Sequence, residues 1–170
     1  YLNPDHPVQQ HILRTISIMC SLEIDHIKVG TDGCSVPTFA MPLYHAALGL
    51  ARFVDPHNLP EEQAQGCQKI TQAMTHNPYM VAGPERFDTQ LMEISGGKVL
   101  AKSGAEAYQG LGIPPHVLPD ADQGLGIALK IADGDRGKRA KAPVVLDVLR
   151  QLGILTLEDL EKLAAYGPQK

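Results

Sequence analysis

Gly124-Leu125-Gly126-Ile127-Ala128-Leu129-Lys130-Ile131-Ala132-Asp133 is the stretch that decides the fold class. Its larger apolar side chains come at every second residue, so Leu125, Ile127, Leu129 and Ile131 would share one face of an extended segment. A period of two is typical of a strand that rests one face on a core. The pattern therefore predicts a β-strand over residues 124–133.

Two shorter segments are also predicted as strands. Residues 98–104 form an apolar run that ends in small residues, and residues 26–29 are a short alternating segment. Glycines interrupt residues 105–112, which predicts a hairpin-like or irregular connection there.

Helical spacing of apolar residues fills most of the remaining chain. Ile12, Ile16 and Met19 are predicted core positions of the first helix, and Thr156 is the predicted N-cap of the last. The helix predicted over residues 38–54 is apolar almost all round, so we expect it to be well buried. Pro42 is either tolerated near the start of this helix or marks its true first turn. Gly83-Pro84 places residues 79–84 in a loop. The predicted helices cover residues 7–22, 38–54, 61–76, 86–94, 141–152 and 157–165.

The order of these segments sets the class. Helices come in blocks around two or three strands, without the strand–helix alternation of a doubly wound sheet. We therefore expect an α+β fold in which an antiparallel sheet is flanked by helices, and the length of 170 residues predicts a single domain over residues 1–170.

Composition excludes several classes of function. A formal net charge of −4 gives no electrostatic basis for binding nucleic acid or an anionic membrane. No apolar run approaches the roughly 18 residues of a membrane span, and no signal peptide opens the chain. Three cysteines without paired spacing imply no disulfide framework and favour a reducing, cytoplasmic location.

A tight loop is predicted at Val29-Gly30-Thr31-Asp32-Gly33-Cys34-Ser35-Val36-Pro37-Thr38. Glycine permits positive φ and proline stops a strand, so the loop would present the Asp32 carboxylate beside the Cys34 thiol. Two interpretations stay open at this point: a functional site, or an Asp-Gly turn beside a small buried cysteine.

Lys102-Ser103-Gly104 ends a predicted strand and resembles the Lys-Thr/Ser-Gly triad of serine β-lactamases and penicillin-binding proteins. Such a lysine holds an anionic substrate group or, with a depressed pKa, accepts a proton. The alternative is a solvated charge at the end of a strand. The sequence contains no zinc-protease helix motif, Cys-x-x-Cys, phosphate loop or dinucleotide fingerprint.

Four motifs in order carry a family resemblance: Tyr1-Leu2 with His6-Pro7-Val8-Gln9, Asp32 to Thr38, Gly97-Lys98 leading to Lys102-Ser103-Gly104-Ala105-Glu106, and Ile127 to Gly134. Together they span nearly the whole chain. The sequence resembles the C-terminal portion of the bacterial asparaginase II family of the Rhizobium etli type, which is distinct from the asparaginases with a threonine nucleophile.

The resemblance implies a fold similar to serine β-lactamases and glutaminases, and hydrolysis of L-asparagine to L-aspartate and ammonia by a homodimer. It implies a serine nucleophile activated by a lysine, with a second serine–lysine pair to which Lys102 belongs. Asp32 would hold the amino group of the substrate or orient the lysines, and Ser103 and Gly104 would bind substrate. Cys34 would be a zinc ligand, with a further Cys and a Lys completing the protein ligands, and no organic cofactor is implied.

In the family, the nucleophile's Ser-x-x-Lys motif and a Cys-Ser-Gly-Lys zinc motif precede the matched segment, and we expect neither motif within residues 1–170. Because the sequence begins at Tyr1 without a methionine, we expect it to be a C-terminal part whose N-terminal part is missing. The chain alone is then predicted to be inactive and to bind zinc weakly, since Cys34 cannot make a four-coordinate site by itself. The alternatives are a non-catalytic binding or structural domain of this fold, and a serine hydrolase acting on another amide such as glutamine.

Overall fold

The strand predicted over residues 124–133 forms one edge of a three-stranded antiparallel sheet in the computed structural model, which describes residues 1–168. The order is β3-β4-β5, and Leu111 of the central strand lies opposite Ala101 on one side and Ile127 on the other. A separate hairpin pairs β1 with β2. The strands are β1 (Lys28–Thr31), β2 (Pro37–Ala40), β3 (Leu100–Gly104), β4 (Tyr108–Ile113) and β5 (Leu125–Lys130).

The hairpin-like or irregular connection predicted over residues 105–112 is confined to residues 105–107, which join β3 to β4. The prediction is wrong for residues 108–112, because they belong to the central strand of the sheet. Glycines at alternate positions of β4, Gly110 and Gly112, fall on the face that a helix covers. A Cβ atom on Gly112 would come within 2.4 Å of a Val54 side-chain carbon, and one on Gly126 of β5 within 1.8 Å of the Ala47 carbonyl oxygen. These glycines therefore mark close approach of helix to sheet, not a turn.

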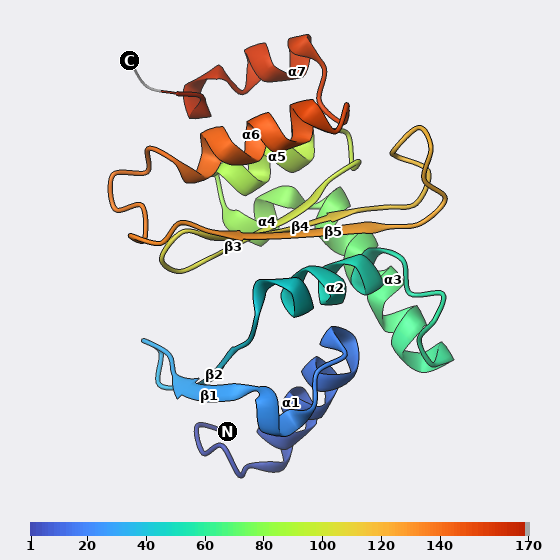
Figure 1. Ribbon diagram of the computed structural model, residues 1–170, viewed down its shortest axis with the longest axis vertical. Coiled ribbons are helices and arrows are strands. Elements are labelled where there is room, and N and C mark those ends of the chain that lie inside the picture. The colour runs from blue at the N-terminus through green and yellow to red at the C-terminus, as the bar shows by residue number, and fades with distance from the viewer. Residues whose placement is uncertain (169–170) are drawn as a thin grey trace.

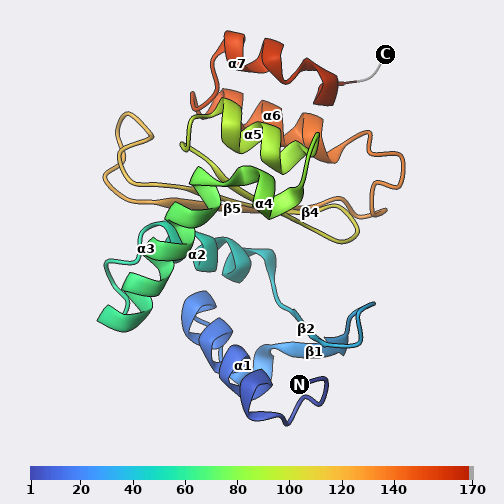
Figure 2. The ribbon, with the colours of Figure 1, turned by 180° about the vertical axis from the view of Figure 1, so that it is seen from behind.

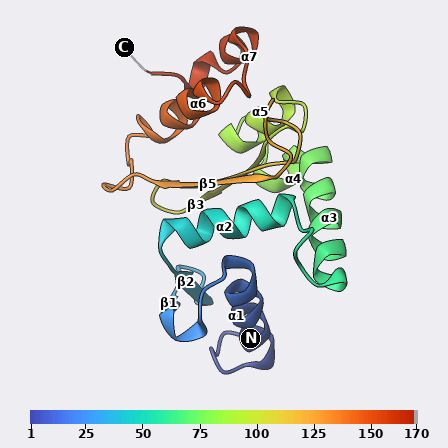
Figure 3. The ribbon, with the colours of Figure 1, turned by 45° about the vertical axis from the view of Figure 1, so that its right-hand side comes forward.

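Helices cover both faces of the sheet (Figures 1 and 2). On one face lie α5 and α6, with α7 beyond them; on the other lies α2, followed by α1 and the β1–β2 hairpin. Figure 3 shows β5 between α6 and α2. The helices are α1 (Pro7–Cys20), α2 (Leu43–Val54), α3 (Glu61–His76), α4 (Pro78–Ala82), α5 (Phe87–Ile94), α6 (Lys141–Gln151) and α7 (Leu157–Lys162), with short 3-10 turns at Ile24–His26 and Ala164–Tyr166.

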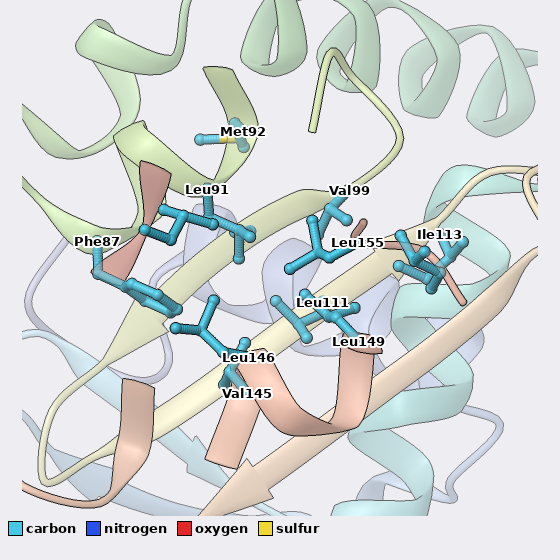
Figure 4. Close-up of a cluster of buried hydrophobic side chains, with 13 residues drawn as sticks. Phe87, Leu91, Met92, Val99, Leu111, Ile113, Val145, Leu146, Leu149 and Leu155 are labelled. Atoms are coloured by element: carbon cyan, nitrogen blue, oxygen red, sulfur yellow. The ribbon is translucent and has the colours of Figure 1, made fainter. Parts of the chain in front are cut away.

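The main core lies between the sheet and helices α5, α6 and α7 (Figure 4). Leu91 of α5, Leu111 of β4 and Leu149 of α6 are fully buried in it, together with Val99 and Ile113. This cluster removes large aliphatic side chains from water, which is the main favourable term in folding.

The α+β class is confirmed, and most predicted helices are confirmed with boundaries shifted by a few residues. Thr156 does cap α7, in a reciprocal capping box with Asp159. The loop predicted over residues 79–84 is wrong, because Pro78–Ala82 forms the short helix α4. The predicted helix over residues 38–54 is wrong at its start: residues 37–40 are strand β2, and α2 begins directly after Pro42.

Two burial predictions on the α1 and α2 side are also wrong. Ile12 is 38% exposed, whereas Leu13 and Cys20 are the buried apolar residues of α1. The first turn of α2 exposes 72% of Tyr44, because only one side of this helix rests on the sheet. Within residues 1–168, no helix is both long and apolar enough to cross a membrane.

Candidate functional site

A cavity of about 1000 Å³ lies on the α2 side of the sheet, and we call it the apolar groove. Helices α1 and α2, strand β2 and the strands of the main sheet surround it. Its wall is formed mainly by apolar side chains such as Met19, Phe39 and Leu50, and Lys102 and Tyr108 also line it. Burial raises the pKa of the Tyr108 hydroxyl, and the Cys20 thiol nearby raises it further.

Lys102 lies on β3, an edge strand of the sheet, and lines the apolar groove together with Gly104. Its Nζ atom donates a hydrogen bond to the Ser103 carbonyl oxygen at 2.8 Å. No carboxylate oxygen within residues 1–168 lies within 4 Å of this ammonium group. Lys102 therefore places an ammonium group at the edge of the apolar groove, and no close ion pair in the described chain compensates its charge.

Ser103 lines a different cavity, described below, because successive side chains of a strand point to opposite faces. Its Oγ and its backbone N–H both donate to one carboxylate oxygen of Asp88, at 2.5 and 2.6 Å. The Gln109 side-chain amide donates to the other oxygen of Asp88 at 3.0 Å. Asp88 is 1% exposed, so these three donors compensate for the loss of water around a buried carboxylate.

Asp32 and Cys34 lie at the turn of the β1–β2 hairpin, and both are exposed. The Asp32 carboxylate accepts a hydrogen bond from the Gly33 N–H at 2.8 Å, and the Cys34 Sγ lies 3.6 Å from its second oxygen. The interpretation of Cys34 as a buried thiol is wrong. Thr38 of β2 lines the apolar groove, but the turn with Asp32 and Cys34 does not.

The structure thus divides the predicted site residues among three places. Lys102 and Gly104 line the apolar groove, Ser103 faces the other side of the sheet, and Asp32 and Cys34 form a pair at the hairpin turn. No hydrogen bond or ion pair in residues 1–168 joins Lys102 to Asp32.

The described residues do not provide a complete ligand set for the zinc ion that the family resemblance implies at Cys34. Cys34 and Asp32 supply two adjacent donors, but no group of three or more His, Cys, Asp or Glu side chains within residues 1–168 is placed to hold a metal ion. A structural zinc site needs four ligands. The described residues alone therefore do not form a zinc site.

The other two cysteines are structural. Cys20 and Cys67 are buried, and burial raises the pKa of both thiols. Such thiols stay protonated and unreactive near neutral pH. The interpretation of Cys20 as a buried apolar residue is confirmed.

Ser95-Gly96-Gly97-Lys98 has the formal Ser-x-x-Lys spacing, which sequence reasoning overlooked. Ser95 is buried at the C-cap of α5, and its Oγ donates to the Met92 carbonyl oxygen. Gly96 and Gly97 both have positive φ, so Lys98 does not follow Ser95 by one helical turn. This segment is a helix terminus and does not form a serine–lysine pair.

Asp88 was also missed. It sits inside the α5 helix, in Phe87-Asp88-Thr89, and nothing in the local pattern distinguishes it from an ordinary first-turn carboxylate. Its contact with Ser103, 15 positions along the chain, could have been found only from the packing of α5 on β3.

The comparison with curated proteins returns no match. The family model described as L-asparaginase II matches residues 1–170, the whole of the chain. The earlier recognition from four ordered motifs is confirmed, and the chain belongs to the L-asparaginase II family.

Proposed function

We propose that this chain forms part of an amidohydrolase that converts L-asparagine and water to L-aspartate and ammonia. Membership in the L-asparaginase II family suggests this activity. The structural observation that carries the proposal is the position of Lys102: an ammonium group on an edge strand, beside a groove large enough for a small substrate and without a close carboxylate.

Lys102 would act next to a serine nucleophile. As the lysine of the second serine–lysine pair, its ammonium group would hold the α-carboxylate of the substrate, while another lysine activates the nucleophile. The activating lysine would take the proton of the serine hydroxyl as its oxygen attacks the amide carbon, and would pass that proton to the leaving nitrogen, so that ammonia departs. Water would then hydrolyse the ester to release L-aspartate and free the serine.

Lys102-Ser103-Gly104 on an edge strand beside a helix-lined groove supports a β-lactamase-like arrangement. In this proposal Gly104 keeps the strand edge open for the substrate, since it carries no side chain into the groove. Ser103 would help to hold β3, and with it Lys102, in position, because Asp88 accepts two hydrogen bonds from Ser103. Asp32 is proposed to pair with the amino group of the substrate; because the hairpin turn does not line the apolar groove, this role requires residues from outside these 170.

The nucleophile is proposed to come from outside these 170 residues, as are the further ligands that zinc at Cys34 requires. A homodimer is part of the same proposal. Zinc binding is testable separately: a Cys34→Ala variant should lower the zinc content of the protein made from its natural reading frame, with little change in its melting temperature.

The direct test measures ammonia release from L-asparagine and L-glutamine, side by side, by two samples. One is the 170-residue chain and the other is the protein encoded by its natural reading frame. We expect turnover of L-asparagine by the second sample and none by the first. Lack of turnover by both would contradict the proposal and support a non-catalytic binding domain. A preference for L-glutamine would correct the substrate.

A further inference from the structure

A second cavity, of about 520 Å³, lies on the side of the sheet opposite the apolar groove, and we call it the basic cavity. The start of α5, the end of β3, the loop before α6 and the 3-10 turn that follows α7 surround it. Phe87 and Tyr166, whose ring centroids are 5.2 Å apart, give it an apolar wall.

Four cationic residues line the basic cavity: Arg86, Arg136, Lys138 and Lys141. None of the four side chains has a carboxylate oxygen within 4 Å in the part of the chain that the structure describes. None makes a side-chain hydrogen bond there either. By contrast, Arg139, just outside the cavity, pairs with Asp133.

The two carboxylates that line the cavity compensate these cations only in part. Asp135 is buried and accepts hydrogen bonds from the backbone N–H groups of Arg139, Ala140 and Lys141, so it balances the positive end of α6. Glu85 also lines the cavity, and its side chain is exposed to solvent. Even with both counted, four cations and two carboxylates leave an excess of two positive charges.

Lys141 is half-buried, and burial lowers its pKa. Asp88 and Asp135 raise its pKa, whereas Arg86 and Lys102 lower it further. The ammonium group is therefore only partly compensated by the charges that surround it, and a bound anion would supply the missing compensation.

We propose that the basic cavity binds a small dianion of the phosphate class, either free phosphate or a phosphate monoester. Guanidinium and ammonium groups are the usual partners of phosphate oxygens, and the excess of two positive charges in the cavity matches the charge of a phosphate dianion. The cavity exceeds the size of a bare phosphate ion, and the wall of Phe87 and Tyr166 would contact the organic part of a monoester.

The test titrates the protein encoded by the natural reading frame with inorganic phosphate and with phenyl phosphate by isothermal calorimetry at low ionic strength. Sodium acetate at matched ionic strength is the control ligand. We expect saturable binding of one equivalent of both phosphates and none of acetate. Tighter binding of phenyl phosphate would identify monoesters as the source of the ligand, and equal affinity would identify free phosphate.

Three variants locate the site. Lys141→Met should weaken phosphate binding by about tenfold, the loss expected for one charged hydrogen bond. Because Lys141 is half-buried, the exposed double variant Arg136→Gln/Lys138→Gln provides a second test that does not disturb the core. Lys69→Met is the matched control, since this exposed lysine of α3 lines neither cavity. Absence of saturable binding, or equal loss in the control, would overturn the proposal.

Discussion

The two faces of the main sheet are built differently. The face under α5 and α6 is sealed by a continuous cluster of fully buried aliphatic side chains (Figure 4). On the opposite face, α2 makes its closest contact at glycines, and the space between α2, α1 and the hairpin stays open as the apolar groove. The first face therefore supplies most of the buried core and leaves only the smaller basic cavity at one end, while the second leaves room for the larger apolar groove.

Strand β3 connects the two faces. Alternation along the strand places Lys102 toward the open groove and Ser103 toward the sealed side, where Asp88 holds it by two hydrogen bonds. A functional side chain on a strand that is fixed from behind is held more precisely than one on a loop. The predicted residues Asp32 and Cys34, in contrast, depend on an exposed hairpin turn.

The largest expected loss of stability comes from Gly126→Ala, on the face of the sheet that α2 covers. The added methyl group would overlap the Ala47 carbonyl oxygen, so α2 would have to move away from the sheet. We expect a loss of more than about 3 kcal/mol in the free energy of unfolding, measured by urea denaturation. Gly66→Ala in α3 is the control, because nothing lies within 4 Å of the new methyl group. It should stabilise the chain by up to ~1 kcal/mol.

The comparison of the two faces is sharpened by a pair of truncations. Leu149→Ala, in the sealed core, should cost about 2–5 kcal/mol of unfolding free energy. Ile12→Ala, on the 38%-exposed position of α1, should cost less than about 1 kcal/mol. Equal losses in the two variants would show that α1 is covered in solution and would contradict the division into sealed and open faces.

A smaller change in stability is expected when the pH is lowered, because Asp135 becomes protonated. The N–H of Lys141 and its neighbours donate to this carboxylate and hold its pKa below the usual value. A lowered pKa stabilises the fold above the unfolded value of about 3.9, and this stabilisation is lost as the pH falls through the folded value. Asp135→Asn should therefore be less stable than the natural chain near neutral pH.

The difference should shrink in acid, as followed by thermal melting from roughly pH 6 down to pH 2. Asp120→Asn is the matched control, since the Asp120 carboxylate is exposed and makes no hydrogen bond or ion pair in the described chain. A difference between Asp135→Asn and the natural chain that does not change with pH would show that Asp135 does not act through its charge.

The sequence predicted those parts of the fold that depend on local pattern. The alternation of apolar residues in residues 124–133 predicted strand β5, and helical spacing predicted α3 and α6. Each pattern depends only on its own segment, and all three predictions were confirmed. Strand β4 could not be recognised, because its glycines are explained only by the approach of α2. The site shows the same limit: Lys102 was identified by a motif, but the support that Asp88 gives to Ser103 depends on contacts between distant segments.

We propose that Lys102 takes part in amide hydrolysis at the apolar groove. The most direct measurement is the kcat for ammonia release from L-asparagine by a Lys102→Met variant of the protein encoded by its natural reading frame. Lys69→Met serves as the control, and a melting curve is recorded for each variant. We expect kcat to fall at least about a hundredfold in Lys102→Met with an unchanged melting temperature. Activity retained in Lys102→Met at the level of the control would contradict it.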